Sequence, residues 1–181
     1  VLYFAGCYAS FIRPEIGEAA VKVLNRAGLR VIIPDQHCCG LPMLSKGRPE
    51  KARKKISANL AKWYDKLASA DHLVVTCSSC GLSLLQEWDY VLEDDRIATV
   101  KRKLIDVSSL VLRYADRLRF DGPAPKIGYH MPCHLKMQAR SRSSIELLKK
   151  IPGSKVAELD SHCCGMAGSW GMSKHNYALS K

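Results

Sequence analysis

The stretch His37-Cys-Cys-Gly40 returns near the other end of the chain as His162-Cys-Cys-Gly165. Both copies are preceded by the same order of features: a short apolar segment, one cysteine, an amphipathic segment, a glycine and a second apolar segment. Agreement in residue type, spacing and expected structure indicates an internal repeat. The lone cysteine and the first cysteine of the pair lie at nearly equal separations in the two copies: Cys7 and Cys38, then Cys133 and Cys163.

The first copy reads as a strand–helix–strand unit. Apolar segments 1–5 and 29–33 have the length and composition of buried strands. Between them, Pro14 suits the first turn of a helix and Gly28 suits the position after its end. Such a unit predicts parallel strands, and a third strand is expected over residues 72–76. The predicted fold class is therefore α/β, with two repeated halves that each hold a small, mainly parallel sheet flanked by helices.

The repeat also predicts where the halves divide. Asp121-Gly-Pro-Ala-Pro125 has the composition of a linker. We expect a first repeat over residues 1–120, a linker over 121–125 and a second repeat over 126–181. The remaining expected elements are helices over 49–69, 82–92, 106–120 (with Asp106 or Ser108 as N-cap) and 143–151, and strands over 126–130 and 155–159.

The second repeat is expected to be truncated. The first half closes with Cys77-x-x-Cys80, and the equivalent pair of the second half would fall beyond Lys181. The chain also begins with Val1, inside an expected strand. We therefore expect this sequence to be a piece of a longer protein.

The composition excludes several classes of protein. Eight cysteines among 181 residues are too few for a small disulfide scaffold. With 47% hydrophobic and 25% charged residues, the chain is not a disordered tail. No apolar run reaches the roughly 18 residues of a membrane-spanning helix.

Five cysteines of the first half are expected to meet. Each of them lies at the end of an expected strand or in the loop that follows one. Because the carboxyl ends of parallel strands share one edge of a sheet, the five thiols should gather there. They are Cys7, Cys38, Cys39, Cys77 and Cys80.

Three kinds of chemistry compete for this group. Disulfides are disfavoured, because the number is odd and the adjacent and closely spaced pairs make poor staples. Zinc in a closed structural site takes four ligands, which would leave one thiol spare. An iron–sulfur cluster uses thiolates on several iron atoms, so five thiolates suit it best. We favour the cluster, and zinc and disulfides stay open as alternatives.

The pattern resembles a known family, the cysteine-rich CCG domain. Its motif is matched by Cys7, the Cys38-Cys-Gly40 triplet and Cys77-x-x-Cys80. The family includes the B subunit of heterodisulfide reductase, iron–sulfur subunits of glycolate and lactate oxidation, and the C subunit of anaerobic glycerol-3-phosphate dehydrogenase. Finer detail, such as Cys38-Cys-Gly-Leu-Pro42 and Ile151-Pro-Gly153, is most similar to the last of these.

The resemblance implies a set of ligands and a cofactor. In heterodisulfide reductase, a complete cysteine set is associated with a noncubane [4Fe–4S] cluster, whereas some relatives hold zinc in one set or have an incomplete one. The first set carries over completely, and the second lacks its closing pair. The residues implied as cluster or metal ligands are Cys7, Cys38, Cys39, Cys77 and Cys80, with Cys133, Cys163 and Cys164 from the second half.

The resemblance also implies a function. It suggests an iron–sulfur electron-transfer subunit of a flavin-dependent dehydrogenase complex, of the anaerobic sn-glycerol-3-phosphate dehydrogenase type. A partner subunit would carry the flavin, and electrons would pass toward a membrane quinone from a peripheral position on the inner, cytoplasmic face of the cell membrane. Family members also carry an N-terminal ferredoxin-like segment, which is not found from Val1 onward and, if the full protein has it, would lie before Val1. The alternatives are a heterodisulfide-reductase-like or glycolate/lactate-oxidation subunit, or a zinc-binding structural module.

Other polar residues carry weaker indications. His37 and His162 precede the cysteine pairs and are either hydrogen-bond donors to a cluster or ordinary loop residues. His130 and His134 flank Cys133 without counterparts in the first half, so any proton or quinone chemistry of theirs is expected in the second half alone. The net charge of +11 and the lysine-rich helix over 49–69 indicate either a solvated face or a docking surface for an acidic partner or anionic lipid. No nucleic-acid-binding module, nucleotide loop or catalytic nucleophile is recognisable.

Overall fold

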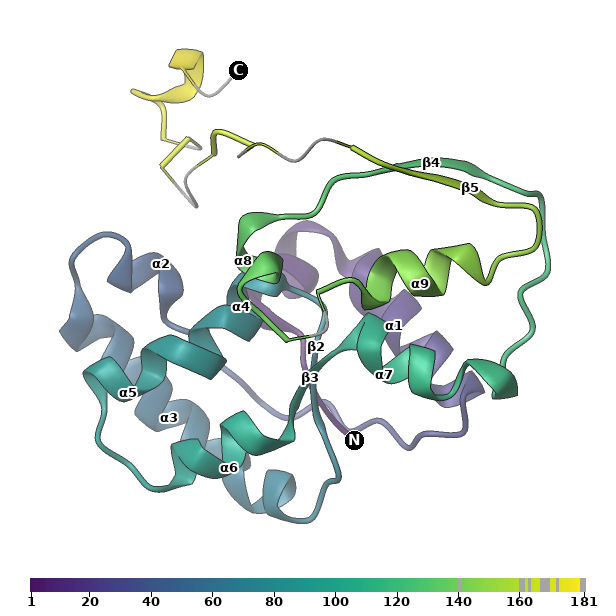
Figure 1. Ribbon diagram of the computed structural model, residues 1–181. Helices are drawn as coiled ribbons and strands as arrows, with labels where there is room; N and C mark the ends of the chain where they lie inside the picture. The colour runs from purple at the N-terminus through teal and green to yellow at the C-terminus, as the bar shows by residue number, and fades with distance from the viewer. Residues whose placement is uncertain (140, 160–161, 163, 167–169, 172, 180–181) are drawn as a thin grey trace.

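The computed structural model describes residues 1–139, 141–159, 162, 164–166, 170–171 and 173–179 (Figure 1). It is an α/β structure with two small parallel sheets, one in each half of the chain. The predicted fold class is therefore confirmed. Cys163, one of the predicted ligands, lies outside the described residues.

The sheet of the first half has three parallel strands in the order β1-β2-β3. They are β1 (Leu2–Phe4), β2 (Leu73–Val75) and β3 (Leu104–Asp106). Every residue of β1 and β2 is buried. This is the pattern of a parallel sheet that is covered on both faces.

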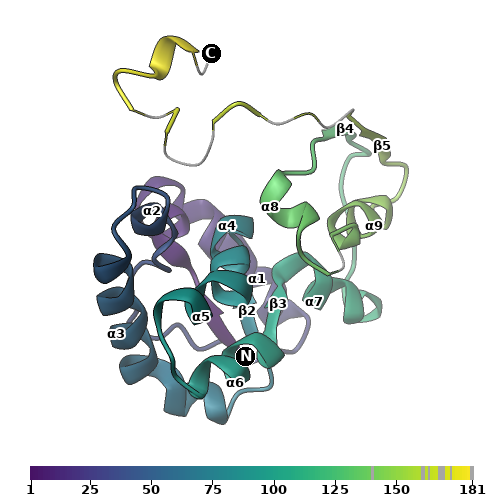
Figure 2. The same cartoon turned by 60° about the vertical axis from the view of Figure 1, so that its left-hand side comes forward.

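Alternation along the strands divides the core into two layers. Leu2 and Phe4 of β1 pack with α3 (Pro49–Ala68), α5 (Trp88–Val91) and α6 (Arg96–Lys103). The residue between them, Tyr3, packs with α1 (Pro14–Arg26) and α7 (Val107–Arg113) on the opposite face. Figures 1 and 2 show the two groups of helices on opposite sides of the sheet.

The first layer is centred on three aromatic rings. Trp63 of α3 lies 6.3 Å from the ring of Phe4 and 6.1 Å from the ring of Trp88. All three side chains are fully buried. Each such pair contributes about 0.5–1.5 kcal/mol beyond its buried area, so the layer below the cysteine loops is firmly packed.

The second half repeats the strand–helix–strand order on a smaller scale. Its strands β4 (Lys126–Tyr129) and β5 (Lys155–Glu158) are parallel, as predicted. Helices α8 (Cys133–Lys136) and α9 (Ser143–Lys149) connect them, and α9 packs against α7 of the first half. The two strands extend beyond α9, away from the larger sheet (Figure 1).

One predicted strand is absent from the structure, and one observed strand was missed. Residues 29–33 do not form a strand, because they pair with β1 through a single bridge between Leu2 and Ile32. Pro34 follows directly and has no N–H with which to continue the ladder. The third strand of the sheet is β3, which pairs with β2 on the side away from β1 and was not predicted. A strand of three residues between two helices is too short to show alternation.

The helices also differ from the prediction in detail. The helix expected over 82–92 begins earlier, at α4 (Ser78–Leu82), and continues through a π-helical turn, η2 (Ser83–Glu87), into α5. The helix expected over 106–120 ends at Arg113, and Asp106 is its N-cap, accepting from the Ser109 N–H at 3.0 Å. The other elements are η1 (Tyr8–Ile12), α2 (Leu41–Leu44), η3 (Ala115–Arg117) and η4 (Tyr177–Leu179).

The expected linker is outside regular structure. Residues 121–125 belong to no helix or strand, and Gly122 has a φ of 138°. The domain boundaries at 120 and 126 stay a prediction. Among the described residues, the structure contains no helix that is long and apolar enough to cross a membrane.

Candidate metal centre

The five cysteines of the first half lie side by side. Their side chains form a chain of contacts that runs from residue 7 through 38, 39 and 80 to 77. Cys7 follows β1, Cys77 follows β2 and Cys80 lies in α4. The pair Cys38–Cys39 comes from the loop after residue 32, which is bridged to β1. The expected convergence at one edge of the sheet is thus present in the structure.

The five cysteine side chains differ in their exposure to solvent. Cys39 and Cys80 are 2% and 3% exposed. Cys38 and Cys77 are half-buried, whereas Cys7 is exposed. The group therefore has a closed end inside the core and an open end at Cys7.

Contacts between the thiols shift their pKa values in opposite directions. The neighbouring Cys80 thiol and the backbone N–H groups of Ser79 and Cys80 lower the pKa of Cys77 to about 6, against the effect of burial. Hydrogen bonds from Cys38 and Cys80 lower the pKa of Cys39. Hydrogen bonds with Cys39 and Cys77, followed by burial, raise the pKa of Cys80. Thiolates are the form of cysteine that binds metals, and this group stabilises them at two positions.

Asn59 of α3 fixes the loop that carries the cysteine pair. Its side chain is fully buried. The Oδ1 atom accepts a hydrogen bond from the backbone N–H of His37 at 2.7 Å. The Nδ2 atom donates to the carbonyl oxygens of His37 at 3.3 Å and Cys38 at 3.1 Å. Asn59 was not identified from the sequence. The signal that could have found it is a single amide side chain among the apolar residues of the helix.

Side chains of α5 and η2 bind the backbone of Cys39, the other cysteine of the pair. The indole N–H of Trp88 donates to the carbonyl oxygen of Cys39 at 2.9 Å. The hydroxyl of Ser83 donates to the same oxygen at 3.3 Å. Because both donors are buried, these bonds fix the backbone of Cys39 relative to the aromatic core.

Two glycines with positive φ angles border the cysteine group. Gly6 has a φ of 68°, and a Cβ atom there would lie 2.9 Å from the Sγ of Cys80. Gly40 follows the cysteine pair with a φ of 98°, which favours glycine. Both positions accept a side chain only with strain.

The helix that begins at Cys133 packs on the Cys77-x-x-Cys80 segment. The Nδ1 of His134 lies 2.8 Å from the Ser79 hydroxyl. The side-chain amide of Gln138 donates to the carbonyl oxygens of Ser78 and His134, each at 2.8 Å. His134 thus contacts the first half, next to the first cysteine group, whereas any proton or quinone chemistry of His130 and His134 stays a prediction.

The second cysteine set is not assembled in the described residues. Cys133 and Cys164 are both exposed, and Cys163 lies outside the described part. Within the described ranges, which include the five first-half cysteines, no three His, Cys, Asp or Glu side chains are placed to hold a single metal ion, so the first group is assembled as pairwise contacts between thiols. Metal binding by Cys133, Cys163 and Cys164 stays a prediction.

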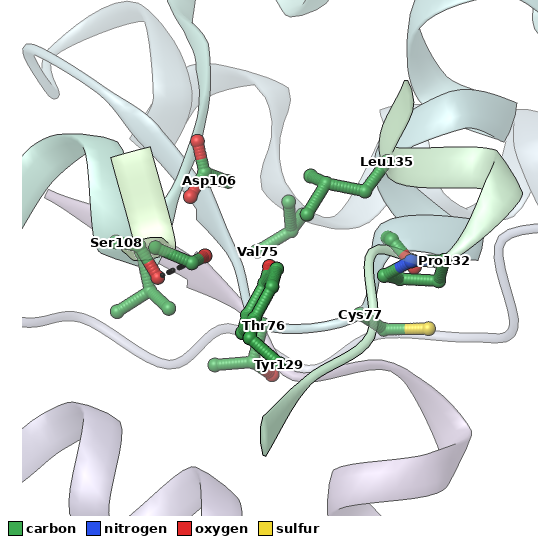
Figure 3. A pocket seen from close by; sticks show the side chains of 11 residues that line it. Val75, Thr76, Cys77, Asp106, Ser108, Tyr129, Pro132 and Leu135 are labelled. Carbon is green, nitrogen blue, oxygen red and sulfur yellow. Dashed lines mark hydrogen bonds between the residues drawn. The ribbon is translucent and has the colours of Figure 1, made fainter. Parts of the chain in front are cut away.

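A pocket lies beside the first cysteine group, between the two halves of the chain. It has a volume of about 210 Å³ and is lined by residues at the ends of β2 and β3 and by residues of the second half. Figure 3 shows Thr76 and Cys77 on the same pocket as Ser108 and Tyr129. A small molecule in this pocket would contact Cys77.

The remaining predicted features are solvent-facing or structural. The lysine-rich face of α3 is mostly exposed, with Lys62 paired to Asp35 and Arg53 paired to Glu50. His37 is held through its backbone by Asn59.

Comparisons with known proteins agree with the cysteine pattern. The family described as the CCG cysteine-rich domain matches residues 1–85 and 127–180. Over 190 residues, the chain is 33% identical to the C subunit of the anaerobic glycerol-3-phosphate dehydrogenase of Escherichia coli (strain K12), covering all of this chain and 47% of that protein.

Two further relatives are more distant. The probable glycolate oxidase iron-sulfur subunit of Bacillus subtilis (strain 168) is 29% identical over 93% of this chain and 40% of its own length. The B subunit of the CoM/CoB fumarate reductase of Methanothermobacter marburgensis is 27% identical over 92% of this chain and 32% of its own length. The chain thus spans about half or less of the length of these relatives.

Proposed function

Because the chain belongs to the CCG cysteine-rich domain family, we propose that it is an iron–sulfur electron-transfer subunit of an oxidoreductase complex. The observation that supports this most directly is the contact chain of five cysteines at one edge of the larger sheet. The relatives named above are subunits of dehydrogenases and reductases, and one is described as an iron-sulfur subunit.

The donor set fits an iron–sulfur cluster. Five thiols are available, and the shifts in their pKa values favour thiolates at Cys39 and Cys77. Cys7, Cys38, Cys39, Cys77 and Cys80 would hold the cluster. When bound, an iron–sulfur cluster supplies reversible one-electron transfer.

The protein itself would orient and shield such a group. Asn59 and Trp88 fix the backbone of the cysteine pair, and the buried side chains of Cys39 and Cys80 exclude water from one end. At the other end, the exposed Cys7 brings the group to the surface, where a redox partner can approach.

The finer assignment follows the relative in E. coli. We propose that electrons come from a flavin-containing subunit that oxidises sn-glycerol 3-phosphate and leave toward a membrane quinone. The complex would lie on the inner face of the cell membrane. Cys133, Cys163 and Cys164 would contribute to a second site, completed by residues outside this sequence. Zinc stays open as the metal at one of the two sites.

Metal analysis with EPR spectroscopy tests the proposal. Protein purified without oxygen should contain iron and acid-labile sulfide and give a cluster signal on reduction. Cys80→Ser should lose most of this iron, because Cys80 is buried and contacts both Cys39 and Cys77. Cys133→Ser is the matched control and should keep the first-site iron. Zinc without iron in the wild-type protein would contradict the electron-transfer role and favour the structural module.

A further inference from the structure

An apolar groove lies between α1, α7 and α9. It has a volume of about 440 Å³, and its walls include Ile16, Val23, Val111 and Leu147. None of the described residues that line it is charged. Such a groove suits an uncharged, lipophilic ligand.

The groove adjoins the pocket beside Cys77. Thr76, Val107 and Ser108 line both cavities, so the two meet at the carboxyl ends of β2 and β3. Figure 3 shows Thr76 between Ser108 and Cys77. A ligand that extended from the groove past these shared residues would reach the pocket that Cys77 lines.

The groups at the junction are hydroxyls. Ser108 accepts a hydrogen bond from Ser144 at 3.0 Å, which leaves its own hydrogen free to donate to a ligand. The Thr76 hydroxyl lies 2.8 Å from the hydroxyl of Tyr3, and when Tyr3 donates, Thr76 also has a hydrogen to give. Hydroxyl donors recognise a carbonyl oxygen.

The charges of the lining residues disfavour an anionic ligand. Asp106 is the charged residue in the lining of the inner pocket, and its carboxylate accepts two hydrogen bonds from Ser109. No Lys or Arg is among the described lining residues of either cavity. A phosphate, a fatty-acid carboxylate or a phospholipid headgroup would therefore enter without a cation to pair with it.

We propose that these two cavities form one binding site for a lipophilic quinone. The ring carbonyl would accept from Ser108 and Thr76 beside Cys77, and the apolar tail would lie between α1, α7 and α9. This inference rests on the proposed electron-transfer function and adds to it the place where an acceptor binds.

The test is equilibrium binding of a decyl-substituted benzoquinone to the oxidised protein as isolated, by calorimetry. Ala19 lines the groove from an exposed position of α1, so Ala19→Phe should fill the groove and weaken binding at least tenfold. The matched control is Ala61→Phe, at an exposed position of α3, and should bind like the wild type. Ser108→Ala should weaken binding roughly 2- to 10-fold through the loss of one hydrogen bond.

Two results would overturn the inference. If decanoate or a single-chain phospholipid bound as tightly as the quinone, the groove would be a general site for acyl chains. Unchanged quinone affinity in Ala19→Phe would place the ligand elsewhere. Iron content is measured on the same samples, so that quinone binding by iron-free protein would contradict the proposed function while supporting this site.

Discussion

The Nδ2 of Asn59 donates a hydrogen bond to the carbonyl oxygen of Cys38, 3.1 Å away, from the middle of a buried helix face. The same side chain also binds the backbone N–H and carbonyl of His37. One amide thus ties the cysteine-pair loop to α3, and the geometry of the proposed metal site depends on it.

Asn59→Leu should destabilise the protein by about 1–3 kcal/mol, because it leaves part-buried backbone groups of residues 37 and 38 without their side-chain partner. Chemical denaturation measures this loss. The control is Asn25→Leu, at an exposed position of α1, and should change the free energy of unfolding by less than about 0.5 kcal/mol. Equal effects of the two substitutions would show that the loop does not need the amide.

Trp88→Phe removes the indole N–H that donates to the Cys39 carbonyl and leaves a gap beside Trp63. We expect a loss of about 1–3 kcal/mol of stability together with lower iron content. The comparison is Trp170→Phe, since Trp170 is 47% exposed and should tolerate the change. Wild-type iron content in Trp88→Phe would mean that Ser83 alone suffices to hold Cys39.

Gly6→Ala should lower the iron content per chain, because its Cβ would lie 2.9 Å from the Sγ of Cys80 and displace that sulfur. Gly47→Ala is a matched control: its φ of 64° imposes comparable backbone strain, but nothing lies within 4 Å of the added atom. Both variants should lose about 1 kcal/mol of stability or more. Metal analysis compares the iron content of the two variants. A lower iron content in Gly6→Ala than in Gly47→Ala would be due to the contact with the Cys80 sulfur.

His72 should make stability depend on pH. Burial, followed by the nearby Arg113, lowers the pKa of His72 in the folded state. The unfolded chain then binds a proton more readily, so stability is present above pH of about 6.5 and is lost as pH falls through the folded pKa. Denaturation at several pH values checks this. His72→Gln should flatten the curve in that window, and an unchanged slope would assign it to another group.

Much of the fold could be predicted because its signals are local. The helix that begins at Pro14 and ends before Gly28 is defined by its own start and stop residues, and its bounds agree with α1. Residues 29–33 failed as a strand because pairing depends on a partner, and Pro34 ends it after one bridge. For β3, three residues were too few to show a pattern.

By itself, the sequence determined that the chain is a repeated α/β structure and that five cysteines gather at one edge of a sheet. The ends of strands and the apolar periodicity of helices depend on residues that are close in sequence, so they can be predicted from the sequence. The tertiary structure alone decided that Asn59 and Trp88 hold the cysteine pair, that His134 reaches Ser79, and that an apolar groove adjoins the pocket lined by Cys77. These relationships join segments that are distant in sequence, and they depend on how whole helices pack.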